Sequence, residues 1–160
     1  MEYNLADEFL NAVQGTRRST REGEEAVHKP LLLLLALARV QRGQPRLVPF
    51  TELEPRLLSL LEEYGPPRKT QASYPFWRLR NDGIWEVLPT TGLVMRKSNT
   101  DPTVTSLRRS GAAGGFLEKY DTLLRQQPEF LKKVARFILA EYFPPDLRDE
   151  IALAAQLSLD

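Results

Sequence analysis

Residues 28–40 read HKPLLLLLALARV and set the architecture of the whole chain. Leucine and alanine fill nearly every position, so a helix made from this stretch is apolar on all sides and must be enclosed by other elements. Pro30 suits the first turn of that helix, where its missing N–H costs no hydrogen bond. Basic residues favour a helix end between Arg39 and Gly43. The stretch therefore predicts a buried central helix.

Further helices are expected on both sides of the central one. Thr51 and Glu54 match a capping box that would begin one of them, and the Gly-Pro-Pro after Tyr64 would end it. Apolar residues at helical spacing predict the others. The predicted helices cover residues 5–14, 51–64, 103–110, 116–126, 128–142 and 146–157, and the sequence GAAGG would close the one that ends at residue 110.

Residues 72–87, ASYPFWRLRNDGIWEV, set aromatic side chains beside arginines. Of the two loop lengths that fit Asn81-Asp82-Gly83, the three-residue loop pairs apolar residues with apolar ones and leaves the charged residues on the other face. We therefore expect a β-hairpin with Gly83 in the left-handed position. Arg78 and Arg80 would project outward from it as a small wing.

The chain has 160 residues, so we expect one domain over residues 1–160. Its fold class is predicted as mainly α with a small β-hairpin (α+β), with winged-helix-like character. Without cysteine it has neither disulfides nor thiolate metal sites. The longest apolar run is shorter than the roughly 20 residues that a membrane span needs. The polar, acidic start does not resemble a secretory signal, which indicates a cytoplasmic protein.

Charge is distributed unevenly along the chain. The net charge is +1, but residues 68–109 contain eight basic and three acidic residues, which gives +5 there and −4 elsewhere. Such segregation is typical of nucleic-acid binders. A solvated surface with charges scattered by chance would give the same count, so charge alone does not decide between the two interpretations.

The sequence offers little for catalysis. His28 is the one histidine, and the chain contains neither a nucleophile-elbow motif nor a phosphate-binding loop. Its paired carboxylates lie in predicted helices or charged loops, where solvated surface is the simpler interpretation. We expect a binding domain with no catalytic residues, metal ligands or cofactor.

Three strings together resemble a known family: HKPLLLL from His28, YPFWRLRNDGIW from Tyr74, and LRRSGAAGGF from Leu107. They are similar to the sulfur-binding domain of McrA-type HNH restriction endonucleases, over most of residues 25–120. The resemblance implies a reader of double-stranded DNA in which sulfur replaces one non-bridging phosphate oxygen. It also implies a targeting role in a modification-dependent restriction system, with any nuclease activity in a separate, fused or associated HNH domain.

The resemblance also implies a sulfur pocket. Tyr74 and Pro75 match the pocket wall of the family, and His28 and Lys29 match a pair at the start of the long helix. Relatives often have arginine where Lys29 stands, so the bidentate guanidinium fork is lost there. Arg78 follows the motif directly. A further family arginine matches Arg96, Arg108 or Arg109, and the sequence does not choose among them.

Contacts to the DNA backbone and bases are expected around that pocket. Cations would supply affinity through counterion release, and polar side chains would read base edges. The expected contact residues are Arg18, Thr70, Gln71, Ser73, Arg80, Arg96, Lys97, Ser98, Asn99, Ser106, Arg108 and Arg109.

Two other functions fit the same residues. A winged-helix regulator of unmodified DNA would use the basic wing and a palindromic site. A protein–protein interaction domain would use the aromatic residues and would not bind DNA. For Phe76, Trp77 and Trp85 we expect core packing rather than ligand contact.

Overall fold

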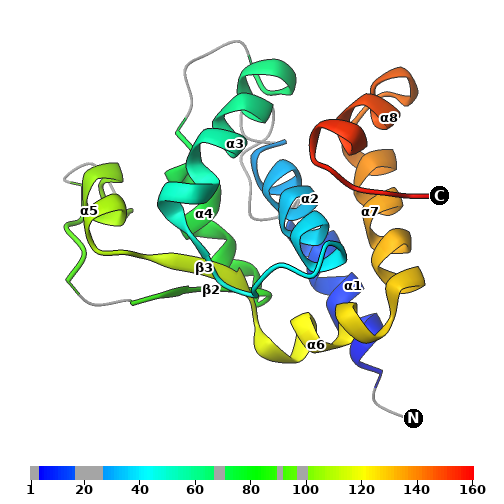
Figure 1. Ribbon diagram of the computed structural model, residues 1–160, viewed down its shortest axis with the longest axis horizontal. Helices are drawn as coiled ribbons and strands as arrows, with labels where there is room; N and C mark the ends of the chain where they lie inside the picture. The colour runs from blue at the N-terminus through cyan, green and yellow to red at the C-terminus, as the bar shows by residue number, and fades with distance from the viewer. Residues whose placement is uncertain (1–3, 17–26, 67–70, 90–91, 97–100) are drawn as a thin grey trace.

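The computed structural model describes residues 4–16, 27–66, 71–89, 92–96 and 101–160. Figure 1 shows α2 (His28–Gln41) between α3 (Phe50–Tyr64) and α7 (Pro128–Tyr142), with a small sheet next to α4 (Ser73–Arg78). The other helices are α1 (Leu5–Gly15), α5 (Val104–Arg109), α6 (Glu118–Gln126), α8 (Pro145–Ala154) and the 3-10 helix Leu79–Asp82. This mainly helical α+β fold agrees with the prediction.

The central helix is enclosed as expected. Every residue from Leu31 to Ala38 is buried, and α2 contacts α3, α4, α6 and α7. Truncation of one such leucine to alanine typically destabilises a protein by about 2–5 kcal/mol. The helix ends at Gln41, and Gly43 follows in the left-handed conformation with φ 73°, which is the usual way for a chain to leave a helix.

The sheet has three antiparallel strands in the order β1 (Val48–Pro49), β3 (Ala113–Phe116), β2 (Trp85–Leu88). Gly114 of the middle strand pairs with residues on both neighbours. A Cβ atom at Gly114 would lie 2.8 Å from the ring of Phe76 and 2.9 Å from that of Trp85. Glycine is therefore what lets β3 approach α4, and the segment expected only to close a helix is a strand.

The predicted hairpin across Asn81-Asp82-Gly83 is wrong. Residues 73–82 are helical, and β2 pairs with β3 instead of with the preceding segment. The turn signal itself is correct, because Gly83 is left-handed with φ 78°. The arginines before it lie on α4 and the 3-10 helix, so no wing exists there, and the winged-helix regulator loses the feature that suggested it.

The predicted capping box at Thr51 is also wrong. α3 begins one residue earlier, at Phe50, with Pro49 at the N-cap and no side-chain cap. Phe50 is fully buried and its N–H donates to the carbonyl of Ala112 at 2.8 Å. Tertiary packing thus fixes the helix start, and Glu54 is left available for a different partner.

The remaining helices agree closely with the sequence. α7 has the bounds predicted for it, α1 ends one residue later than predicted, and α5 is one residue shorter at each end. α6 starts two residues late because Phe116 is the last residue of β3. α8 stops at Ala154, three residues early, just before Gln156 takes a left-handed φ of 67°. Within the described ranges, no helix is long and apolar enough to span a membrane.

An aromatic cluster joins the sheet to the helices. Phe76 lies 4.9 Å from Phe50 and 6.2 Å from Trp85 between ring centroids, and Trp85 lies 5.8 Å from Phe116. The indole N–H of Trp85 donates to the Phe76 carbonyl at 2.9 Å. Trp77 is buried as well. Phe76, Trp77 and Trp85 are core residues, as the sequence predicted.

Candidate nucleic-acid interface

Tyr74, in the first turn of α4, has a half-buried ring flanked by two arginines. The guanidinium carbon of Arg78 lies 4.5 Å from the ring centroid, and that of Arg96 lies 5.6 Å from it. Arg96 Nη1 also donates to the phenol oxygen of Tyr74 at 3.0 Å and to Gln71 Oε1 at 2.8 Å. Cations at these distances are attracted to the ring face. One aromatic side chain thus holds two positive charges beside it.

Arg96 reaches Tyr74 because residues 94–96 pair with residues 101–103. Met95 pairs with Pro102, Arg96 N–H donates to the Asp101 carbonyl at 2.8 Å, and Thr103 N–H donates to the Val94 carbonyl at 2.8 Å. This pairing brings Arg96 and Asp101 to α4 together.

Asp101 connects that segment to α4. Its buried carboxylate accepts a hydrogen bond from Arg78 Nε at 2.9 Å and lies 2.8 Å from Arg78 Nη2. The pair fixes the guanidinium of Arg78 next to the ring of Tyr74. We refer to Gln71, Tyr74, Arg78, Arg96 and Asp101 as the tyrosine–arginine cluster.

The other residues expected in the sulfur pocket are less accessible. His28, Lys29 and Pro75 are buried. Lys29 Nζ donates to Asp82 Oδ2 at 2.7 Å, and both side chains are almost completely enclosed. The lysine joins α2 to the turn before Gly83. Replacing either member of such a buried ion pair strongly destabilises a protein, because the other charge is left uncompensated in the interior.

Arg80 stacks on an aromatic ring of its own. Its guanidinium carbon lies 3.7 Å from the ring centroid of Trp77, within the range of a cation–π contact. Trp77 is itself buried. Arg80 therefore covers the core here while its charge stays half-exposed.

The three candidate arginines of the sequence stand in different places. Arg96 lies in the tyrosine–arginine cluster. Arg108, on α5, makes a bidentate pair with Glu54 of α3, at 2.7 and 2.8 Å, and this pair raises the pKa of the Arg108 guanidinium. Arg109 is exposed and lines a cavity of about 440 Å³ beside α5, together with Val94 and Ser106.

Comparison with known proteins identifies the family. The family model described as the ScoMcrA-like DNA sulfur-binding domain matches residues 6–160. The chain belongs to this family. No curated protein sequence matches it.

Solved sulfur-binding domains have the same fold. That of ScoMcrA complexed with phosphorothioated DNA is 29% identical, with a TM-score of 0.77 over 94% of this chain and 98% of that one. That of SprMcrA, also complexed with phosphorothioated DNA, has a TM-score of 0.69 over 95% of this chain and 96% of that one, at 22% identity.

Larger structures contain this domain as one part. The sulfur-binding and SRA domains of ScoMcrA complexed with phosphorothioated DNA are matched at 31% identity and a TM-score of 0.78, over 89% of this chain and 46% of that one. The Type IV phosphorothioation-dependent restriction endonuclease ScoMcrA is matched at 29% identity and a TM-score of 0.76, over 93% of this chain and 28% of that one. The chain thus spans under a third of the endonuclease.

Several of the expected DNA contacts of this sulfur-binding domain form hydrogen bonds within the fold. Ser73 is buried and donates to Gln71 Oε1 at 3.4 Å, and Ser106 is buried with its hydroxyl on the carbonyls of Thr103 and Val94. Gln71 is half-buried in the tyrosine–arginine cluster. The expected contacts Arg18, Thr70, Lys97, Ser98 and Asn99 lie outside the described residues.

The carboxylates that pair with Lys29 and Arg78 were not predicted from the sequence of this family member. Asp82 and Asp101 are two of the three acidic residues in the basic segment 68–109, and they pair with Lys29 and Arg78. A signal was present, because isolated acidic residues among many cations are candidates for ion pairs. Which cation each one meets depends on the tertiary fold.

Proposed function

We propose that this chain binds double-stranded DNA carrying a phosphorothioate, with the sulfur against the exposed part of the Tyr74 ring, between Arg78 and Arg96. The observation that carries the proposal is the half-buried Tyr74 ring, which has the guanidinium of Arg78 close to its centre and that of Arg96 hydrogen-bonded to its hydroxyl. Membership of the sulfur-binding-domain family supports it, as do the relatives complexed with phosphorothioated DNA.

The chemistry of the cluster suits sulfur better than oxygen. Sulfur is larger, more polarisable and less strongly hydrated than a phosphate oxygen. An oxygen pressed on an aromatic ring would lose water without gaining a hydrogen bond, which costs about 1–3 kcal/mol on protein mutational scales. Sulfur loses less hydration and gains dispersion contact with the ring. Since about 1.4 kcal/mol is tenfold in affinity, this one atom is enough to decide binding.

Each residue of the cluster has a proposed role. Arg78 and Arg96 attract the phosphate group, and Arg96 is the family arginine that the sequence left open. Asp101 holds Arg78 in place. Pro75, His28 and Lys29 support the cluster from within the fold, because they are buried. Arg80, Lys97, Arg108 and Arg109 add affinity for the backbone that does not depend on sulfur.

We further propose that the chain is a recognition module without catalytic activity of its own. The endonuclease ScoMcrA is much longer than the matched region, so DNA cleavage would belong to a fused or associated HNH nuclease domain. The module would then direct that nuclease to phosphorothioated DNA.

The test compares three duplexes of one sequence: with a phosphate oxygen, with an Rp sulfur and with an Sp sulfur at one position. Fluorescence anisotropy at fixed salt measures each affinity. We expect one diastereomer to bind at least about tenfold better than the oxygen duplex. Because the ring supplies the contact, Tyr74→Ala should abolish this preference and Tyr74→Phe should keep most of it.

The matched control is Lys133→Gln, an exposed cation on α7. It should leave the sulfur preference unchanged. Equal affinity of the wild-type chain for all three duplexes would overturn the proposed function. A Tyr74→Ala variant that keeps full preference would remove the tyrosine from it.

A further inference from the structure

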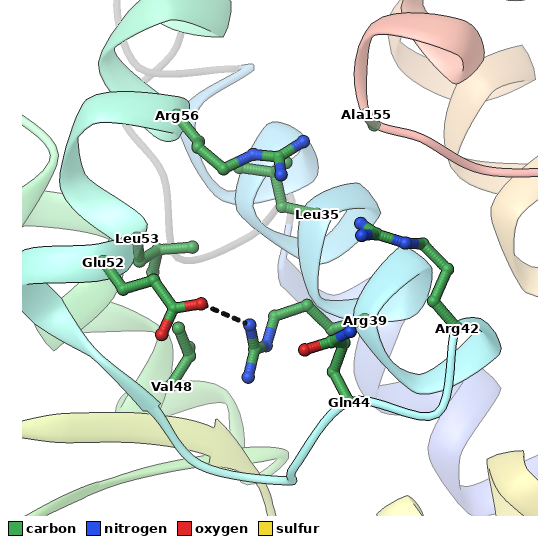
Figure 2. A pocket seen from close by; sticks show the side chains of 9 residues that line it. All are labelled: Leu35, Arg39, Arg42, Gln44, Val48, Glu52, Leu53, Arg56 and Ala155. Carbon is green, nitrogen blue, oxygen red and sulfur yellow. Dashed lines mark hydrogen bonds and ion pairs between the residues drawn. The ribbon is translucent and has the colours of Figure 1, made fainter.

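A second positively charged site lies at the far end of α2. Figure 2 shows a cavity between α2, α3 and the chain after α8, with three arginines among its lining residues. Its volume is about 60 Å³, which is room for several water molecules or one small oxyanion. Leu35, Val48 and Leu53 form an apolar floor beneath the charges.

Two of the arginines have little else to bind. Arg56 is exposed on α3 and has no ion pair or hydrogen bond with any residue the structure describes. Arg42 donates to the side-chain oxygen of Gln156 and has no carboxylate partner within the same ranges. Their guanidinium groups extend toward one another across Leu35 from α2 and α3 (Figure 2).

The third arginine is partly satisfied. Arg39 Nη1 donates to Glu52 Oε1 at 3.2 Å, and Nη2 donates to the Pro45 carbonyl at 3.2 Å. Its Nε atom is buried and has no hydrogen-bond partner among the described residues. With Glu52 as the one carboxylate of the lining, three arginines leave the cavity with a net charge of +2.

The backbone adds to this charge. Glu52 and Leu53, in the first turn of the 15-residue helix α3, line the cavity. That helix end has no side-chain hydrogen-bond cap, so its N–H groups add partial positive charge, which Glu52 in the same turn offsets in part. The C-terminal end of α2 opposes it, but the carbonyl of Arg39 is already bonded to Gln44 N–H at 2.9 Å.

We propose that this cavity binds a phosphate group. Two guanidinium forks that are not tied to carboxylates can each take two oxygens of a tetrahedral ion, whereas a carboxylate offers two oxygens in total. The apolar floor lowers the local dielectric and strengthens the attraction. Glu52 competes with the anion for Arg39.

The site is separate from the tyrosine–arginine cluster. No residue of that cluster lines the cavity. Arg39 lies at the other end of α2 from Lys29, ten residues or about 15 Å along the helix axis. The phosphate group would come from free phosphate or from a DNA backbone position away from the sulfur. The inference therefore stands whether or not the chain reads sulfur.

Isothermal titration calorimetry with sodium phosphate tests the proposal, with sodium chloride and sodium acetate titrations at equal ionic strength as reference. We expect phosphate to bind and the reference salts not to. Arg56→Gln and Arg42→Gln should each weaken phosphate binding about tenfold, the usual effect of losing a charge-assisted hydrogen bond. Glu52→Gln should strengthen it, because the competing carboxylate is gone. Lys133→Gln, an exposed cation elsewhere, should leave it unchanged.

The proposal is overturned if phosphate gives no more heat than the reference salts, or if Lys133→Gln loses as much binding as Arg56→Gln. Tighter binding of acetate than of phosphate would overturn it as well. Anisotropy with an unmodified duplex separates the two sources. If Arg56→Gln weakens duplex binding beyond the Lys133→Gln control, the phosphate is that of DNA; if duplex affinity is unchanged while phosphate binding is lost, the site takes free phosphate.

Discussion

Lys29 and Arg78 are both predicted from the sequence to belong to the sulfur pocket, yet their surroundings in the fold are opposite. The side chains of Lys29 and Asp82 are both 4% exposed, whereas Arg78 is 31% exposed above a carboxylate that is 6% exposed. The first pair is enclosed and holds α2 to the turn at Gly83. The second fixes a cation at the surface, next to Tyr74. Under the proposed function, the depth of each ion pair decides whether its cation supports the fold or contacts DNA.

The largest effect is expected at the enclosed pair. Lys29→Met leaves the Asp82 charge buried without its cation, which should lower the free energy of unfolding by about 3–5 kcal/mol in urea denaturation. The double variant Lys29→Met with Asp82→Leu should recover most of the loss, because two apolar side chains need no partner. If the Lys29→Met chain is stable but loses affinity for phosphorothioated DNA alone, Lys29 is a contact residue and the contrast with Arg78 is wrong.

The next effect concerns DNA affinity and the choice among the arginines. Arg96→Ala removes a cation and a hydrogen bond from Tyr74, so affinity for the sulfur-containing duplex should fall at least about tenfold. Arg108→Ala should weaken binding to modified and unmodified duplex equally, since that arginine lies on α5 beside Glu54. Anisotropy with both duplexes separates the two patterns. If Arg108→Ala lowers affinity for the sulfur-containing duplex alone, and Arg96→Ala lowers both affinities equally, the sulfur contact belongs to Arg108 rather than Arg96.

A smaller effect is expected from the surface pair. A double-mutant cycle with Arg78→Gln and Asp101→Asn should give a coupling of about 1 kcal/mol in the free energy of unfolding, because Arg78 is partly solvated. The coupling should be well below the loss in Lys29→Met. A coupling energy of about 3 kcal/mol or more would show that the Arg78–Asp101 pair behaves like a buried pair, which would contradict its contrast with Lys29–Asp82.

The smallest effect is expected at the exposed pair Lys119–Glu8, whose side chains are 50% and 31% exposed. A hydrogen bond from the Tyr120 hydroxyl, and then one from Lys119, lower the pKa of Glu8. A carboxylate with a lowered folded pKa stabilises the fold above its unfolded pKa of about 4.3, and this contribution disappears as pH falls through the folded pKa. The melting temperature should therefore drop less between pH 6 and pH 3 in Glu8→Gln than in the wild-type chain. If the melting temperature of both chains falls by the same amount, Glu8 does not contribute to the loss of stability in acid.

Much of the fold was predictable because it is local. The leucine run of α2 and the apolar spacing of α7 specify their helices without reference to other segments. The hairpin failed for the opposite reason. Asn81-Asp82-Gly83 correctly indicates a left-handed glycine, but the partner of β2 is β3, about thirty residues later, and a turn signal carries no information about that.

The site was less predictable than the fold. Tyr74 was identified through the resemblance, and its exposure is consistent with a contact role. Arg96 lies beside Tyr74 because residues 94–96 pair with residues 101–103, which no local pattern encodes. The burial of Lys29 depends on Asp82, which is 53 residues away in sequence.

Gly114 gives a criterion for sorting homologous sequences. A methyl group at this position would collide with Phe76 and Trp85, and Phe76 is two residues from Tyr74 on the same short helix. A homologue with a larger residue here would have to displace α4, and with it the tyrosine. Sequences that keep the Tyr-Pro-Phe-Trp string but lose this glycine are therefore poor candidates for sulfur readers, even at high overall similarity.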